Sequence, residues 1–503
     1  MSRRSEKIVI NTLALYVRMA VLMLLSLYTS RLVLNVLGVA DFGLYNVIGG
    51  VVTLFSFLWG AMSSATQRFL SYELGTGNPE NIRNTFSLCM IAHVIIALLL
   101  IAGAECVGVW FINTMMKIPA GRELAANVVF QCTLITLALS IIRVPYHACI
   151  ISYEKMFFFS IQSCMEAVAK LLLALYLSFE VSMDRLILYA IGIMLISIFL
   201  FWWSKFYCYH NFPAIRFCWV KNPKRLKELL HFSGWSIFGS SSTLFAQQGT
   251  NVIVNQFFGV VVNASVGIST QVCGAINGFV GNFQMAFCPQ IVKSYAAGEM
   301  KYLQKLVLAG AKYSFALLLL LALPLLINTR YVIQLWLGQV PEYAVIFIQL
   351  SLLRLLLNSL ACSMYTAIQA TGKIIAYQIW VSSILFLTLP LIYLAFRRGY
   401  PPQAMLVIML ALDLLALVVR VVILKIQIHF PLRLFFSELL LPVGLMLPMG
   451  YGLFVLAGQW PIKTFPGLIV QSAWVDGALL MVMIAFMIKP DERAFLVRLI
   501  KKR

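Results

Sequence analysis

Positive charges inside long apolar stretches are the residues of this sequence that could do chemistry. Arginine or lysine interrupts such stretches at Arg18, Arg143, Lys170 and Arg354. A charge inside a bilayer is costly, so it usually faces a cavity, a partner or the membrane surface. Guanidinium and ammonium groups bind phosphate, and side-chain amides can bind sugar hydroxyls. The predicted substrate-binding residues are Arg18, Arg31, Arg143, Lys170, Arg354, Asn251 and Asn255.

The helical spacing of these residues predicts which other residues share a helix face with them. Arg18 shares a helix face with Asn11, and a polar stripe on a membrane helix points inward. Arg31 lies on another face near the predicted outer end, where it can extend to the headgroups instead. Arg143 belongs to a stripe that forms either a cationic wall opposite Arg18 or a set of hydrogen bonds between helices. The other members of that stripe are Thr136, Ser140 and His147.

Two intramembrane carboxylates are the predicted ion-coupling residues. Glu166 stands four residues before Lys170, so the two can simply neutralise each other. Alternatively Glu166 exchanges a proton or sodium ion while Lys170 binds phosphate. Asp413 shares a face with Arg420, which we expect to reach the inner headgroups. Coupling to H⁺ or Na⁺ therefore stays open for Glu166 and Asp413.

Motifs for catalysis and for cofactors are missing from the sequence. There is no GxSxG, no phosphate-binding loop and no glycine-rich nucleotide fingerprint. The ten cysteines contain no CxxC pair, and the five histidines show no metal-ligand spacing. We therefore expect neither an enzyme nor a bound metal or cofactor.

The composition is that of a protein that crosses a membrane many times. Hydrophobic residues make up 61% of the 503 positions and charged residues 11%, with a mean hydropathy of +0.91. A soluble domain of this length would lack a polar surface. The net charge of +20 comes from loops between apolar stretches. The positive-inside rule explains this charge, with anionic membrane lipids or an anionic substrate as secondary explanations, so we expect no nucleic-acid partner.

Fourteen apolar segments define the predicted fold class, an all-α polytopic membrane protein. With the N-terminus inside, 25 of the 38 lysines and arginines face the cytoplasm, so both termini are predicted to be cytoplasmic. This asymmetry supports fourteen spans and would also fit twelve. The segments cover residues 11–37, 43–65, 85–112, 124–150, 156–179, 185–208, 233–258, 263–288, 306–328, 342–370, 374–396, 402–427, 435–457 and 467–488.

The second half of the chain repeats the pattern of the first. Phe258-Gly259-Val260 echoes Leu37-Gly38-Val39, and Ser294–Gly298 echoes Ser71–Gly75. These echoes predict two parallel six-helix lobes followed by two extra helices. The predicted boundaries are 1–208 for the N-terminal lobe, 209–232 for a basic amphipathic connector on the inner leaflet, 233–427 for the C-terminal lobe, and 428–503 for the extra helices and basic tail.

The first hairpin resembles the start of a polysaccharide flippase of the multidrug/oligosaccharidyl-lipid/polysaccharide exporter superfamily. The resemblance is carried by a span with an embedded arginine, an LG…FGLY turn and a polar SYELGTGN loop. The span count, the charge pattern and the duplication agree with it along nearly the whole chain.

This resemblance implies a function in surface polysaccharide biosynthesis, such as that of lipopolysaccharide O-antigen. The chain would move an undecaprenyl-pyrophosphate-linked oligosaccharide across the bacterial inner membrane by alternating access. Besides this lipid-linked oligosaccharide, other polysaccharide assembly proteins would be candidate partners. A cation-coupled multidrug exporter of the same superfamily is the main alternative, and a membrane-embedded glycosyl- or acyltransferase is a third. The excess of intramembrane cations over carboxylates favours an anionic cargo and so the flippase.

Overall fold

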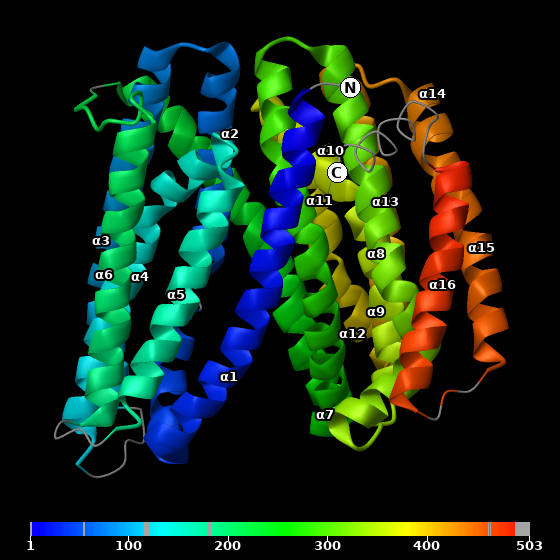
Figure 1. The fold of residues 1–503 in the computed structure, drawn as a ribbon, viewed down its shortest axis with the longest axis horizontal. Coiled ribbons are helices and arrows are strands. Elements are labelled where there is room, and N and C mark those ends of the chain that lie inside the picture. The colour runs from blue at the N-terminus through cyan, green and yellow to red at the C-terminus, as the bar shows by residue number, and fades with distance from the viewer. Residues whose placement is uncertain are drawn as a thin grey trace. The chain divides into compact units, whose positions relative to one another are not determined.

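The computed structural model describes residues 3–53, 56–114, 121–179, 184–220, 222–460, 462 and 464–487 (Figure 1). These residues are almost entirely helical and include no strand. The helices are α1 Arg3–Thr53, α2 Ser56–Thr76, α3 Pro79–Thr114, α4 Glu123–Ser152, α5 Met156–Tyr176, α6 Arg185–Asn211, α7 Pro223–Ala296, α8 Met300–Leu337, α9 Ala344–Ser359, α10 Ala361–Thr371, α11 Ile375–Phe386, α12 Thr388–Arg397, α13 Ala404–Ile428, α14 Leu432–Phe435, a π-helical turn Phe436–Leu440, α15 Leu441–Gly458 and α16 Phe465–Phe486.

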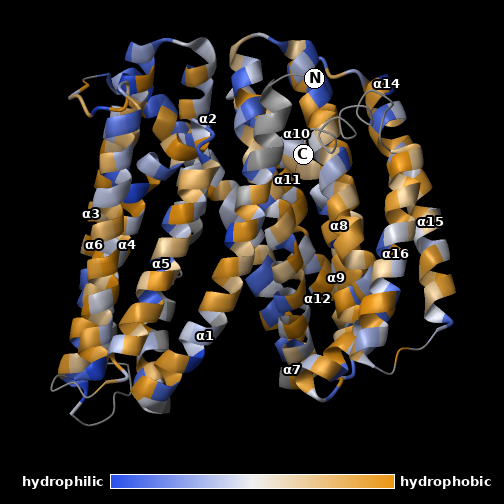
Figure 2. Ribbon diagram, in the orientation of Figure 1, coloured by the Kyte–Doolittle hydropathy of each residue, from blue (hydrophilic) through white to orange (hydrophobic). Residues whose placement is uncertain are grey.

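The predicted fold class, an all-α polytopic membrane protein, is confirmed. Eleven described segments are long and apolar enough to cross a bilayer. The remaining predicted spans correspond to the end of α1 with α2 and to the two arms of α7, which are the more polar ones. Figure 2 shows hydrophobic residues along most of the length of helices such as α9 and α15.

The helices form two compact units, which are described separately. The N-terminal unit covers Lys7–Ser240, and the C-terminal unit covers Ser241–Arg503 together with Met1–Glu6. In the N-terminal unit, α4 packs against α2, α3, α5 and α6. One of its cores joins Leu44 and Ile48 of α1 to Phe130 of α4 and Leu186 of α6, all of them buried. Helix α4 is therefore the central element that positions Arg143.

The C-terminal unit is organised around α8 and α13. Helix α8 contacts α9, α10, α15 and α16, and α13 contacts α9 to α12. The last two long helices lie side by side (Figure 1). Asn328 of α8 donates to Gln471 Oε1 of α16 at 2.8 Å, and Gln471 donates to the carbonyl of Ala457 on α15 at 2.7 Å. These hydrogen bonds tie the two extra helices to the body of the unit.

Two glycines bend the helices at matching positions. Gly38 in α1 and Gly259 in α7 both have φ 77°, with ψ near 180°. This conformation is open to glycine and strained for other residues. Both glycines fall where the sequence predicted a turn between spans, and at each of them the backbone is non-helical, so the residues before and after it form two separate helical arms.

Equivalent residues of the two repeats are separated by one constant interval, and one of the predicted sequence matches does not fit it. The helix-ending glycine that matches Gly298 (φ 74°) is Gly77 (φ 77°), and it is not Gly75. Gly77 and Gly298 are separated by the same interval as Gly38 and Gly259. The start of α3 precedes that of α8 by this interval too, and the start of α4 precedes that of α9 by it.

The basic connector is part of a longer helix and does not form a separate one. Helix α7 starts after Asn222, whose side chain accepts from the amide of Arg225, and it runs on into the C-terminal unit. Its first turns dock on α2, where Arg225 forms an ion pair with buried Glu73 and Phe232 contacts Phe69 at 5.4 Å. The predicted basic tail, 488–503, lies outside the described residues.

Candidate functional site

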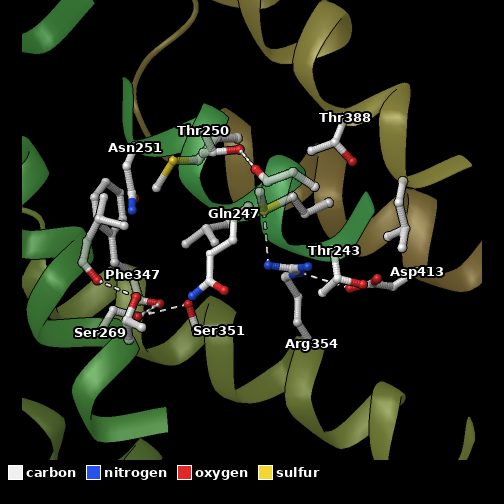
Figure 3. Close-up of a pocket in the computed structure, with 17 residues that line it drawn as sticks. Thr243, Gln247, Thr250, Asn251, Ser269, Phe347, Ser351, Arg354, Thr388 and Asp413 are labelled. Carbon is white, nitrogen blue, oxygen red and sulfur yellow. Dashed lines mark hydrogen bonds and ion pairs between the residues drawn. The ribbon is translucent and has the colours of Figure 1, made fainter. Parts of the chain in front are cut away.

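A polar pocket of about 210 Å³ lies within the C-terminal unit (Figure 3). Both arms of α7 line it, together with α9, α11, α12 and α13. Helix α7 can form this wall because its sequence is rich in small and amide residues, which a lipid-facing helix would not carry. The polar lining residues are Thr243, Gln247, Thr250, Asn251, Ser269, Thr270, Ser351, Arg354, Thr388 and Asp413.

An ion pair between α9 and α13 lies at one side of this pocket. Arg354 Nε donates to Asp413 Oδ2 at 2.9 Å, and Asn358 donates to the same oxygen at 3.2 Å. Both side chains line the pocket, and that of Arg354 is the more exposed, at 24% against 7% for Asp413. The sequence argument counted Arg354 among four cations that outnumber the intramembrane acids. The structure pairs Arg354 with Asp413, which offsets its charge.

Hydroxyl and amide groups face the pocket from the opposite side. Ser269 Oγ donates to the carbonyl of Phe347 at 3.1 Å and is hydrogen-bonded to Ser351 Oγ at 2.9 Å (Figure 3). Asn251 donates to Gln248 Oε1 at 3.3 Å and still lines the cavity. The pocket therefore offers neutral donors and acceptors beside one charged pair, a set that can bind a hydroxyl-rich ligand.

A second cluster, in the N-terminal unit, gathers around Glu166 of α5. Lys170 Nζ lies 2.8 Å from Glu166 Oε1, and Arg143 Nη2 of α4 lies 3.5 Å from Glu166 Oε2. The predicted neutralisation of Glu166 by Lys170 is thus present as an ion pair. Arg143 contacts the same carboxylate, so the three charges sum to +1. Their side chains are 15% to 40% exposed, which leaves them open to a ligand.

Arg18 of α1 adds a further positive charge close to this cluster. Its guanidinium carbon lies 4.6 Å from the ring centroid of Phe159, and the ring of His147 meets the same Phe159 ring edge-on at 5.6 Å. Arg143 precedes His147 by four residues on α4, so the Phe159 and His147 rings connect Arg18 with the helix that carries Arg143. The cationic wall that joins Arg18 and Arg143 stays a prediction.

Two predicted binding residues lie apart from both groups. Arg31 and Asn255 are exposed, and neither lines the polar pocket of the C-terminal unit. Asn255 follows Asn251 by four residues but the pocket includes only Asn251. The extension of Arg31 to the headgroups, the alternative that the sequence left open, stays a prediction.

Sequence reasoning missed two kinds of residue. Lys312 of α8 is buried and donates to the carbonyl of Met487 at 3.0 Å, and a lone lysine in an apolar run was the signal that could have found it. The pocket hydroxyls of Ser269, Ser351 and Thr388 carry no such signal, because serine and threonine are common in membrane helices. Among the described residues no group of three or more His, Cys, Asp and Glu side chains could hold a metal ion.

Comparison with solved structures identifies the fold as that of MATE transporters. The chain superposes on a crystal structure of a MATE point mutant with a TM-score of 0.74 at 12% identity, over 85% of this chain and 97% of that chain. A multidrug resistance MATE family transporter of the MOP superfamily, in an outward-facing conformation, gives 0.73 at 12% identity over 85% and 96%.

A third similar structure comes from Pyrococcus furiosus. It is a MOP superfamily transporter with a TM-score of 0.71 at 12% identity, covering 85% of this chain and 96% of that chain, and it is described by a reversed polarity of its binding pocket that suggests a different function. No family model and no curated protein matches the sequence. At this level of identity the comparison establishes the fold alone.

Proposed function

We propose that this chain is a membrane transporter whose cargo is an anionic lipid-linked oligosaccharide. The observation that carries the proposal is the charge balance around Glu166, whose carboxylate is shared by Arg143 and Lys170, while Arg18 adds a third cation beside the Phe159 ring. Two positive charges remain uncompensated among these groups. A pyrophosphate can offset them, and a cationic drug cannot.

The C-terminal pocket supports a glycan as the remainder of the cargo. Its amides, hydroxyls and the Arg354–Asp413 pair are groups that bind sugar hydroxyls through directional hydrogen bonds. The cargo would be an undecaprenyl-pyrophosphate-linked oligosaccharide, carried across the bacterial inner membrane for surface polysaccharide such as O-antigen. Both termini would be cytoplasmic, and the two repeated lobes would alternate access. Glu166 and Asp413 are the candidate sites for H⁺ or Na⁺ coupling.

A multidrug exporter is the second candidate, and one observation favours it. The solved structures that share the fold are MATE proteins, one of them described as a multidrug resistance transporter. In the C-terminal pocket the Arg354–Asp413 pair is neutral, so this pocket by itself does not repel a cationic cargo.

Reconstitution of the purified protein in liposomes separates the two candidates. Translocation is measured for a fluorescent glycan on a polyprenyl pyrophosphate and for a cationic dye. We expect the first to move and Arg143→Gln to slow it about tenfold, the effect of losing a charge-assisted contact of roughly 1.4 kcal/mol. Lys205→Gln is the matched control, since Lys205 lies 4.6 Å from the Trp202 ring and outside the cluster. Movement of the dye without movement of the glycan lipid would overturn the proposal.

A further inference from the structure

An apolar groove of about 710 Å³ runs along one side of the N-terminal unit. Helices α1, α5 and α6 form it through residues that include Val17, Ile161, Val168, Leu172 and Phe199, and each of these side chains is at least 40% exposed. Its volume lies in the range of sites that enclose a ligand of several hundred daltons. The groove therefore has room for a substantial part of an apolar chain.

One cation, Arg18, interrupts this apolar lining. Its Nε and Nη1 atoms are buried and have no hydrogen-bond partner among the described residues. The carboxylate of Glu166 is held by Arg143 and Lys170. Two buried guanidinium nitrogens without an acceptor are costly even beside the Phe159 ring, and an anion next to the groove would remove that cost.

The depth of Arg18 narrows the class of anion. Arg18 lies seven residues after Asn11, where the apolar span begins, which is about 10 Å along the helix at 1.5 Å per residue. A resident phospholipid keeps its headgroup at the membrane surface, so its phosphate would have to sink to meet this arginine. A lipid that is being carried across the membrane brings its phosphate to this depth.

We propose that the groove between α1, α5 and α6 holds the first part of a polyprenyl chain while Arg18 binds the phosphate attached to it. This inference rests on the proposed function, because it assigns the lipid end of the cargo to the N-terminal unit. Arg18 supplies the charge, and the apolar residues of α5 and α6 supply the surface for the chain. Burial of apolar surface and one charge-assisted contact would add to each other in selecting a phosphorylated lipid.

Photocrosslinking and binding to the purified protein test the proposal. A benzoylphenylalanine at Phe199, inside the groove, should crosslink to a labelled polyprenyl phosphate. The same residue at Leu195, which is 56% exposed on α6 but outside the groove, is the control and should crosslink weakly. The competitors are the matching polyprenol, phosphatidylglycerol and inorganic phosphate.

Two variants separate the contribution of the Arg18 charge from that of the apolar contacts with the polyprenyl chain. Arg18→Gln should weaken binding of polyprenyl phosphate at least tenfold and leave binding of polyprenol unchanged. Ala169→Trp, which fills the groove, should weaken both, whereas Leu195→Trp should weaken neither. Thermal unfolding in detergent verifies that each variant is folded. Competition by phosphatidylglycerol equal to that of polyprenyl phosphate, or full affinity in Arg18→Gln, would overturn the inference.

The proposed function is tested by a different measurement, the translocation of the glycan lipid. If the wild-type protein translocates the glycan lipid but Phe199 does not crosslink to it, the groove assignment is wrong and the function stands. If the groove binds polyprenyl phosphate but no glycan lipid is translocated, the function is wrong and the lipid site stands.

Discussion

Gly38 and Gly259 adopt the same left-handed backbone conformation, φ 77°, at equivalent positions of the two repeats. One bends α1 and the other bends α7, and each lies between the two arms of a long helix. The two kinks, together with the matched starts of α3 with α8 and of α4 with α9, show one structural frame used twice. The charges are not repeated with it: in this register Thr133 is the counterpart of Arg354, and Met364 is the counterpart of Arg143.

The kinks should depend on glycine. We expect Gly38→Ala or Gly259→Ala to destabilise the protein by about 1–3 kcal/mol, because alanine is strained at this combination of φ and ψ. Thermal unfolding in detergent measures the effect. Gly267→Ala is the control, since Gly267 is helical and a methyl group there meets no atom within 4 Å. A loss of stability in the control equal to that at the kinks would show that the strain argument is wrong.

The Arg354–Asp413 pair should matter for stability when one partner is removed. Asp413→Asn leaves Arg354 facing a neutral partner, and we expect a loss of about 3 kcal/mol, the low end for buried pairs because Arg354 stays 24% exposed. The double variant Arg354→Met with Asp413→Leu should recover most of that loss. Denaturant or thermal unfolding of the single and double variants forms the test. If the single and the double variant lost the same unfolding free energy, the cost would not come from leaving Arg354 without its charged partner.

The contact between α7 and α2 should hold the first turns of α7 in place. Arg225→Ala leaves the Glu73 carboxylate, 4% exposed, without its ion-pair partner. We expect faster amide hydrogen exchange over residues 223–240, because local opening of these turns becomes easier. Lys227→Ala, at an exposed position on the same helix, provides the comparison. If hydrogen exchange were unchanged in Arg225→Ala, the ion pair would not be the contact that holds these turns in place.

Glu166 should link transport to an ion gradient if it is a coupling site. Protonation, or binding of Na⁺, would weaken its hold on Arg143 and Lys170 and free both cations for a phosphate. In liposomes with an imposed gradient, we expect Glu166→Gln to lose stimulation of glycan-lipid transport while transport without the gradient remains measurable. Asp413→Asn is measured in parallel to compare the two carboxylates. Full stimulation in both variants would exclude them as coupling sites.

The helices were predictable because their length and composition leave few alternatives in a membrane. The predicted segment 185–208 became α6 Arg185–Asn211, and 467–488 became α16 Phe465–Phe486. The break at Gly259 was predicted as a turn because a glycine marks it in the sequence, and the backbone there is non-helical. The connector, in contrast, was placed apart from its span because its basic face predicts an interfacial helix, and the Arg225–Glu73 contact depends on the fold.

The sites were less predictable than the helices. Spacing along α5 was enough to pair Glu166 with Lys170, because residues four apart are neighbours on a helix. The addition of Arg143 from α4 needed the packing of two helices. The same holds for Arg354 and Asp413, which lie on α9 and α13 and are 59 residues apart in sequence. Charges can be located from one sequence, but their partners on other helices cannot.

Helix α7 passes from one unit to the other at Ser240 and Ser241 without a break in its helical structure. Its turns at this point carry Gly239 followed by three serines, a composition in which helices bend at low cost. If one lobe reorients during a transport cycle, the helix would bend at these few residues, and their backbone hydrogen bonds would be strained and then restored. Replacing the three serines with alanine, a stronger helix former, should slow turnover, although none of them lines the polar pocket.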